Sequence, residues 1–218
     1  MAQQSLIEEQ SEPNDATPFL PEKRTLSALR EAATGCRGCH LWRGATQTVF
    51  GEGLKRARVM FVGEQPGDKE DLAGKPFVGP AGRELDKGLE AAGIARDQAY
   101  VTNVVKHFKF EERGRRRIHQ TPKRFEIDAC MPWLQEELRV VGPEALVLLG
   151  ATAAKALMGS SFRLTQHRGE LLDLELAPIV TATIHPSAIL RQQDDASRSA
   201  EREAFAEDLR VVARALEG

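Results

Sequence analysis

Cysteine, tyrosine and tryptophan are scarce in this sequence, with three, one and two residues respectively among 218. The odd number of cysteines argues against a disulfide framework, which pairs its cysteines and belongs to oxidising compartments. No apolar run approaches the roughly 20 residues that cross a bilayer. The N-terminus also lacks the basic start and apolar stretch of a secretory signal. We therefore expect a cytoplasmic protein with no membrane partner.

An excess of basic charge is missing as well, because 30 Lys and Arg stand against 32 Asp and Glu, for a net charge of −2. Binding to a nucleic acid would therefore have to come from local clusters of charge. The length and the 41% hydrophobic content suit one domain with its own core. Residues 1–22 are polar and contain proline, so we predict a disordered tail there and a single domain over residues 23–218. The sequence shows no apolar stripe that would form a subunit interface, so we expect a monomer.

Short apolar segments alternate with helical patterns along the chain. The apolar segments predict strands over residues 58–63, 99–105, 145–150 and 178–185. Helical spacing predicts helices near residues 24–34, 83–93, 123–140 and 151–159, and the stripe of Phe205, Leu209, Val212 and Leu216 predicts a C-terminal helix. This alternation is typical of a mostly parallel sheet covered by helices on both faces. Such sheets carry their sites at the carboxyl ends of the strands.

Polar motifs stand where three of the predicted strands end. GEQPG at 63–67 brings Glu64 and Gln65, residues 103–107 bring Asn103, and HPSAILR at 185–191 brings His185. A histidine at a strand tip can donate to an oxygen of a bound base, and Ser187 with nearby amides can hold a phosphate. Each motif has a plainer interpretation. GEQPG can be a surface turn that cradles a phosphate, and the histidine can cap the next helix.

The cysteines follow a pattern typical of a metal site. Cys36 and Cys39 form a C-x-x-C pair, and Cys130 lies far downstream. Four-coordinate sites need a fourth ligand, and His107, after the second predicted strand, is the candidate. The spacing alone also allows zinc, or two cysteines in a turn with a third in a helix.

Arginines crowd the segment 109–122, which we predict to be a loop that packs back onto the site. Arg113, Arg115, Arg116 and Arg117 precede His119, and their guanidinium groups suit bidentate contacts with phosphate. A charge run of this kind can also be a solvated, disordered loop.

Taken together, GEQPG with GKPFVGPAG, VTNVVKH, RRRIH and HPSAILR resemble the uracil-DNA glycosylase superfamily. The resemblance covers residues 25–216 and is closest to family 4, the iron–sulfur uracil-DNA glycosylases, and within it to the UdgX type. It implies a three-layer α/β/α sandwich with a central, mostly parallel four-stranded sheet. It also implies a DNA-repair enzyme that excises uracil from DNA, with single strands favoured.

The resemblance also implies roles for individual residues. Glu64 would be the catalytic acidic residue, Phe77 would stack on the flipped uracil, Asn103 would distinguish uracil from cytosine, and His185 would contact uracil O2. Gln65 would complete the uracil-binding set. DNA contacts would come from Arg115, Arg116, Arg117, Ser187 and Arg191, and a 4Fe–4S cluster would be held by Cys36, Cys39, His107 and Cys130.

Three positions depart from ordinary family 4 proteins. His107 stands where those proteins have cysteine, Gln65 replaces a small residue, and the arginine-rich segment ending in His119 is an insertion. In the UdgX type the histidine of this segment bonds covalently to the DNA sugar after uracil leaves, which implies that role for His119 and a single turnover. One alternative is an ordinary multiple-turnover glycosylase of family 4. The other is a non-catalytic nucleic-acid-binding module whose fold is stabilised by zinc.

Overall fold

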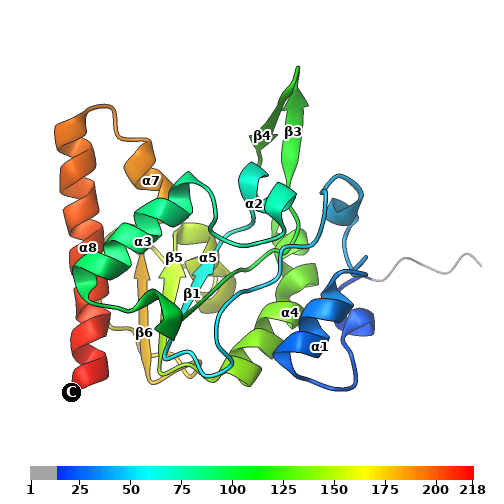
Figure 1. Cartoon of the computed structure of the whole chain (residues 1–218), viewed down its shortest axis with the longest axis horizontal. Helices are drawn as coiled ribbons and strands as arrows, with labels where there is room; N and C mark the ends of the chain where they lie inside the picture. Colours follow the sequence, from blue (N-terminus) through cyan, green and yellow to red (C-terminus); the bar gives the residue numbers. More distant parts are fainter. Residues whose placement is uncertain (1–13) are drawn as a thin grey trace, which may run out of the picture.

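The computed structural model describes residues 14–218, which form an α/β fold around one parallel four-stranded sheet (Figure 1). The strand order is β2-β1-β5-β6, and each neighbouring pair is parallel. Every strand is a short apolar run, as expected for a sheet that is covered on both faces. The strands are β1 (Val59–Gly63), β2 (Ala99–Asn103), β5 (Ala145–Leu149) and β6 (Ile179–Thr183).

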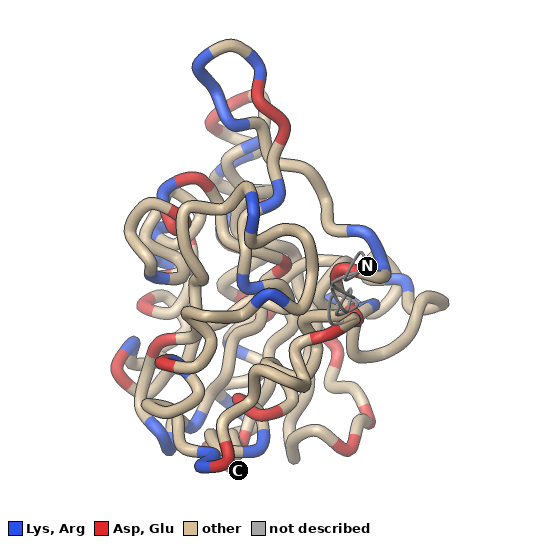
Figure 2. Tube along the Cα trace, turned by 90° about the vertical axis from the view of Figure 1, so that its right-hand side faces the viewer, with Lys and Arg blue, Asp and Glu red and all other residues tan. Residues whose placement is uncertain are grey.

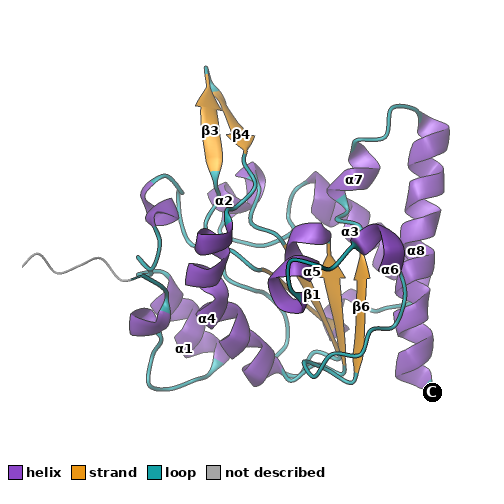
Figure 3. Ribbon diagram, turned by 180° about the vertical axis from the view of Figure 1, so that it is seen from behind, coloured by secondary structure: helices purple, strands orange, loops and turns teal. Residues whose placement is uncertain are grey.

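Helices cover the two faces of the sheet and complete the predicted three layers (Figure 3). One face packs against α4 (Arg124–Val141) and α5 (Ala151–Met158), and α1 (Leu26–Ala33) packs on α4. The other face packs against α3 (Pro80–Ala92) and α8 (Asp195–Glu217). The predicted α/β/α sandwich with a four-stranded sheet is therefore confirmed.

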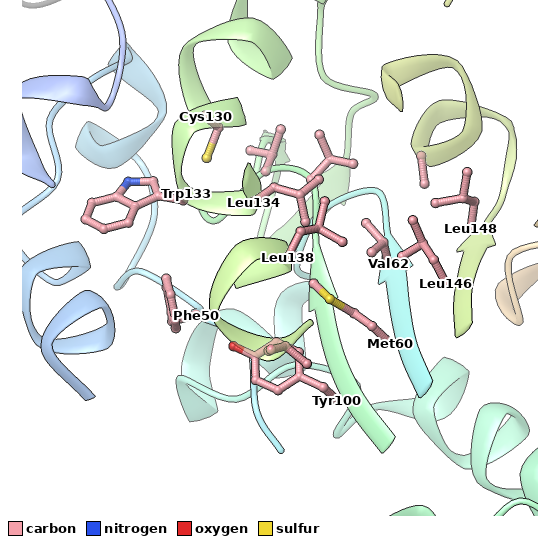
Figure 4. Close-up of a cluster of buried hydrophobic side chains, with 14 of the residues drawn as sticks. Phe50, Met60, Val62, Tyr100, Cys130, Trp133, Leu134, Leu138, Leu146 and Leu148 are labelled. Carbon is pink, nitrogen blue, oxygen red and sulfur yellow. The ribbon is translucent and has the colours of Figure 1, made fainter. Parts of the chain in front are cut away.

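Successive side chains of a strand point to opposite faces, and this alternation divides the core into two clusters. On β1, Met60 and Val62 join Trp133 and Leu134 of α4 in the first cluster, which Figure 4 shows. Phe61 points the other way, into the cluster built by α3 and α8. Both clusters are almost fully buried, so the sheet is clamped between two apolar layers.

The remaining elements lie at the carboxyl edge of the sheet or connect the layers. The most prominent is a two-stranded hairpin that projects beyond that edge (Figure 1). The elements are α2 (Asp68–Ala73), β3 (Phe110–Arg113), β4 (Arg116–His119), α6 (Leu164–His167), α7 (Ser187–Leu190) and the short 3-10 helices Thr17–Phe19, His40–Arg43 and Arg96–Gln98. Among residues 14–218, no helix is long and apolar enough to cross a membrane.

Two expectations need correction within the described residues. The segment 109–122 is not a loop but a hairpin, in which Phe110 pairs with His119 and the turn uses Gly114 at a φ of 62°. A positive φ suits glycine, which has no Cβ to clash with the backbone. Residues 14–22 are not a free tail either, because Ala16 is fully buried and its N–H bonds to the carbonyl of Ala129 at 2.8 Å. The rest of the predicted tail lies outside the described residues.

The packing of α3 on α8 depends on the missing side chain at Gly88. A Cβ placed there would lie 2.5 Å from Cε1 of Phe205 and 3.2 Å from Cδ1 of Leu209. We predict that Gly88→Ala lowers the free energy of unfolding by about 1–3 kcal/mol, as overpacking of a core does. Denaturant unfolding measures this loss. The loss should shrink in a Phe205→Leu background, and equal losses in both backgrounds would contradict the contact.

Candidate active site

A cleft of about 830 Å³ opens at the carboxyl edge of the sheet, beside the hairpin. Its walls come from the ends of β1, β2 and β6, from α2 and α3, and from β4 and α7. The cleft gathers most of the site residues that the sequence analysis proposed, namely Glu64, Gln65, Phe77, Asn103, His119, His185, Ser187 and Arg191. Segments that are more than 100 residues apart in the chain therefore meet at one edge, as the strand topology requires.

Asn103 and Phe77 share a space that exists because residue 63 is a glycine. β1 and β2 pair in a register that sets Gly63 beside Asn103. A Cβ at Gly63 would lie 2.4 Å from Oδ1 of Asn103 and 2.9 Å from Cζ of Phe77. Phe77 adopts a φ of 57°, an unusual conformation for a bulky residue that is typically kept at functional sites.

The side-chain oxygen of Asn103 has no partner within the protein. Asn103 is 3% exposed and lines the cleft, and its Oδ1 is buried with no hydrogen-bond partner. Buried acceptors without a partner are rare in folded proteins because they cost free energy. This oxygen is therefore available to accept a hydrogen bond from a ligand that enters the cleft.

His185 faces Phe77 across the cleft, with ring centroids 6.1 Å apart and the planes inclined by 29°. Its Nδ1 accepts from the N–H of Ser187 at 3.2 Å and lies 2.8 Å from Oγ of the same residue. Arg191 donates to that Oγ at 2.8 Å, so the hydroxyl hydrogen is free to point to Nδ1. The proton of the neutral imidazole consequently resides on Nε2, which becomes a donor. Ser187 thus contacts both His185 and Arg191 and lines the cleft, and its contact with a DNA phosphate stays a prediction.

Glu64 and His119 lie side by side at the edge of the cleft. Nε2 of His119, at the end of β4, lies 3.4 Å from Oε1 of Glu64, at the end of β1. Burial lowers the pKa of His119, Glu64 opposes this shift, and Arg191 adds to it. The imidazole is therefore neutral near pH 7 and keeps the lone pair that a nucleophile or a base needs.

Gln65 fastens the hairpin and also lines the cleft, and its contact with uracil stays a prediction. Its Nε2 donates to the carbonyls of Lys109 at 3.1 Å and Gln120 at 3.0 Å, and its Oε1 accepts from the N–H of Lys109 at 3.0 Å. These two residues flank the hairpin on either side. Both amide protons are used in this way, so Gln65 holds the base of the element that carries His119.

Arg117 also holds the hairpin and is not presented to solvent, which differs from the expected phosphate contact. Its guanidinium donates to Asp68 at 2.7 Å and to Asp71 at 2.6 Å, and it lies over the rings of Phe108 and Phe110. Its side chain is 19% exposed. The sequence offered one signal for this role, since the two aspartates stand three apart on α2 and so share a helix face.

Basic residues gather toward the free end of the hairpin (Figure 2). Arg115 and Arg116 lie there and are exposed, while Arg113 bonds to Glu111 at 3.2 Å. Of the predicted phosphate contacts on the hairpin, Arg115 and Arg116 are therefore the accessible ones.

The three cysteines lie between α1 and α4, behind the end of β2. Cys36 accepts a hydrogen bond from Nε1 of Trp133 at 3.2 Å, and Cys130 accepts one from the N–H of Lys106 at 3.3 Å. Burial raises the pKa of Cys130 to about 12, and the nearby thiols of Cys39 and Cys36 add to the rise. N–H donors of this kind favour sulfur in its thiolate form.

His107 belongs to the same region. It lines a small cavity of about 220 Å³ together with Cys36, and its Nε2 lies 2.9 Å from Oγ1 of Thr48. Over residues 14–218, no group of three or more His, Cys, Asp or Glu side chains is arranged to hold a metal ion. Of the four predicted ligands, Cys36 and His107 border this cavity, and Cys36 and Cys130 each accept a hydrogen bond from an N–H group.

An aromatic face, an amide acceptor without a partner and a neutral histidine donor surround one slot in the cleft. Together with the fold, this slot defines a class of protein that binds a flat, polar ring. The sequence pattern of the uracil-DNA glycosylase superfamily matches residues 50–210, and the chain belongs to that family.

Curated relatives agree with this assignment over most of their length. The chain is 38% identical to the Type-4 uracil-DNA glycosylase of Sulfurisphaera tokodaii over 174 residues, which is 76% of each protein. It is 35% identical to the protein of the same name from Pyrobaculum aerophilum, over 77% of this chain and 85% of the relative. The Type-4 enzyme of Thermotoga maritima is 36% identical, over 79% of this chain and 87% of the relative.

The environment of His185 generates a prediction for the pH dependence of stability. Burial, with Arg191 and His119 nearby, lowers the pKa of His185 to about 4 from its ordinary 6.5. Between these pH values the unfolded chain takes up a proton that the folded chain does not. The free energy of unfolding should therefore fall as the pH drops from about 6.5 to about 4.

Denaturant unfolding across this pH range measures the slope. His185→Gln should reduce it, whereas His167→Gln, which changes an exposed histidine on α6, should leave it in place. An unchanged slope in the His185 variant would show that the depressed pKa belongs to other groups.

Proposed function

We propose that this protein is a uracil-DNA glycosylase, which cleaves the bond between uracil and the DNA sugar. The observation that carries the proposal is the open amide of Asn103 beside the ring of Phe77, in a space kept free by Gly63. The names of the Type-4 relatives support it. A base inside a duplex is out of reach of such a slot, so the substrate is a flipped-out or single-stranded uracil nucleotide.

Each wall of the slot serves one part of the base. Phe77 stacks on the ring, and Oδ1 of Asn103 accepts the N3–H that uracil has and cytosine lacks. The Nε2–H of His185 donates to an oxygen of uracil, where negative charge develops as the sugar–base bond breaks. Glu64 stabilises the positive charge that develops on the sugar.

We further propose that His119 captures the sugar and that the enzyme turns over once. The bond from C1′ to N1 of uracil breaks, and its electron pair leaves with the base. A ring nitrogen of His119 then forms a bond to C1′, and the resulting imidazolium loses its remaining N–H proton to Glu64. The uracil anion takes a proton from solvent. The neutral state of His119 and its 3.4 Å distance from Glu64 support this step.

Arg115, Arg116 and Arg191 supply the phosphate contacts in this proposal. The first two are exposed at the free end of the hairpin, and Arg191 lines the cleft. Bidentate contacts from arginine to phosphate fix the register of a strand without reading its sequence. We propose single-stranded DNA as the favoured substrate and a monomer as the active form.

A labelled oligonucleotide with one uracil tests the proposal, with a thymine oligonucleotide of the same sequence as control. After incubation, boiling in detergent and electrophoresis, we expect a shifted band with the uracil strand only. His119→Ser should remove the shifted band, while uracil release persists because water can reach the sugar. His167→Ser is the matched control and should retain the band.

The outcomes separate the alternatives. Repeated uracil release without a stable adduct would select an ordinary multiple-turnover glycosylase. Binding that ignores uracil, with no base released, would contradict the proposed activity as a whole. A duplex oligonucleotide run in parallel tests the preference for single strands.

We also propose that Cys36, Cys39, His107 and Cys130 hold a 4Fe–4S cluster. When bound, the cluster supplies a covalent cross-link between the segment after α1, the segment after β2, and α4. The buried thiols and their N–H donors support this assignment, and closing such a long loop stabilises the fold.

Iron analysis and visible absorption test the cluster independently of DNA chemistry. We expect a brown protein with about four iron and four sulfide per chain. Cys36→Ala should lose the iron and lower the melting temperature, whereas His107→Cys should retain it because thiolate also binds iron. A colourless protein that contains zinc would refute the cluster.

A further inference from the structure

One ion pair of the described chain is fully buried and lies outside the cleft. Lys106 is 1% exposed and Glu137, in the last two turns of α4, is 0% exposed, and the two side chains form the pair. Neither residue lines the cleft. The mechanism above uses neither of them, and the predicted cluster does not use their side chains.

All three protons of the Lys106 ammonium group have a partner. Besides Glu137, Nζ donates to Oγ1 of Thr102 at 2.7 Å and to the main-chain oxygen of Asn103 at 2.6 Å. The main-chain N–H of the same lysine bonds to Sγ of Cys130. Lys106 therefore joins the backbone of the base-reading asparagine to α4.

The carboxylate of Glu137 also accepts several hydrogen bonds. Its oxygens accept from the hydroxyl groups of Tyr100 at 2.8 Å and Thr102 at 3.0 Å, and from the N–H of Gly51 at 3.0 Å. Burial and the neighbouring carboxylate raise the pKa of Tyr100, so its hydroxyl remains a donor. The network thus fixes two residues of β2, the strand that ends at Asn103.

Stability alone does not account for this pair. Removing two charges from water costs several kcal/mol per ion, and apolar residues of similar size are often as stable or more stable at such sites. What the pair provides that apolar residues would not is a donor for the carbonyl of Asn103. That carbonyl belongs to the residue whose side chain carries the open acceptor in the cleft.

We propose that Lys106 and Glu137 are positioning residues that hold the amide of Asn103 in place for base recognition. This inference rests on the proposed glycosylase function and deepens it. The pair acts on the step in which the base is aligned and cleaved. It does not act on the capture of DNA, which depends on phosphate contacts elsewhere.

The experiment uses the cluster-containing protein and measures uracil release in single turnover. The rate at saturating DNA reports alignment, the amplitude reports the folded fraction, and the half-saturating DNA concentration reports capture. The main variant is Lys106→Met/Glu137→Leu, which removes both charges and leaves no buried ion unpaired. Thr102→Val is a second variant that keeps the shape of residue 102 and removes the hydroxyl bridging the pair.

We expect the double variant to release uracil about 10- to 100-fold more slowly, because a displacement of about 1 Å has effects of this size. The rate is taken per active site from the amplitude. Half-saturation and iron content should stay near wild type. Thr102→Val should also slow uracil release, by a smaller factor than the double variant does. Arg58→Met/Glu144→Leu removes an exposed ion pair at the opposite edge of the sheet and should react like wild type.

A second comparison shows whether the pair acts through Asn103. Asn103→Ala should lower the rate of uracil release by a smaller factor in the double variant than in the wild-type chain, because the amide is already misplaced in the double variant. Equal factors in both backgrounds, or a wild-type rate in the double variant, would overturn the inference. Absence of uracil release from the wild-type protein would instead overturn the proposed function, and the inference with it.

Discussion

The parallel pairing of β1 with β2 is the constraint on which the site depends. Its register sets Gly63 beside Asn103, and the missing side chain at Gly63 leaves one space for both the asparagine amide and the ring of Phe77. The backbone strain at Phe77 and the unpaired acceptor of Asn103 are both costs that the rest of the fold must offset. The two apolar clusters on either side of the sheet provide that stability.

Side-chain hydrogen bonds attach the projecting hairpin of β3 and β4 to the end of β1 and to α2. Gln65 binds both of its ends, and Arg117 ties it to α2 through two aspartates. In the structure both residues hold the hairpin that carries His119. His119 stands at the end of a short strand, with its Nε2 3.4 Å from Oε1 of Glu64. This fits a role in which a side chain must meet one atom of a bound nucleotide.

The electrostatics of the cleft are consistent with this role. His119 and His185 come from distant parts of the chain, yet burial and the shared neighbour Arg191 lower the pKa of both. One histidine is thereby kept as a hydrogen-bond donor with a defined tautomer, and the other retains a free lone pair. The chain belongs to the uracil-DNA glycosylase superfamily, and the hairpin of β3 and β4 carries His119 to the edge of the cleft.

Sequence alone determined the alternation of strands and helices and the positions of the main motifs, because apolar periodicity and glycine or proline boundaries are local signals. It also identified Glu64, Asn103, His119 and His185 as candidates that meet in the cleft. Only the tertiary structure decided that 109–122 is a hairpin, that Gln65 and Arg117 hold it, and that Lys106 pairs with Glu137. Glu137 lies four residues after Trp133, on the apolar face of α4, which hinted at burial. Its partners, however, are 31 to 86 residues away, and hydrogen bonds across such separations leave no periodic trace in the sequence.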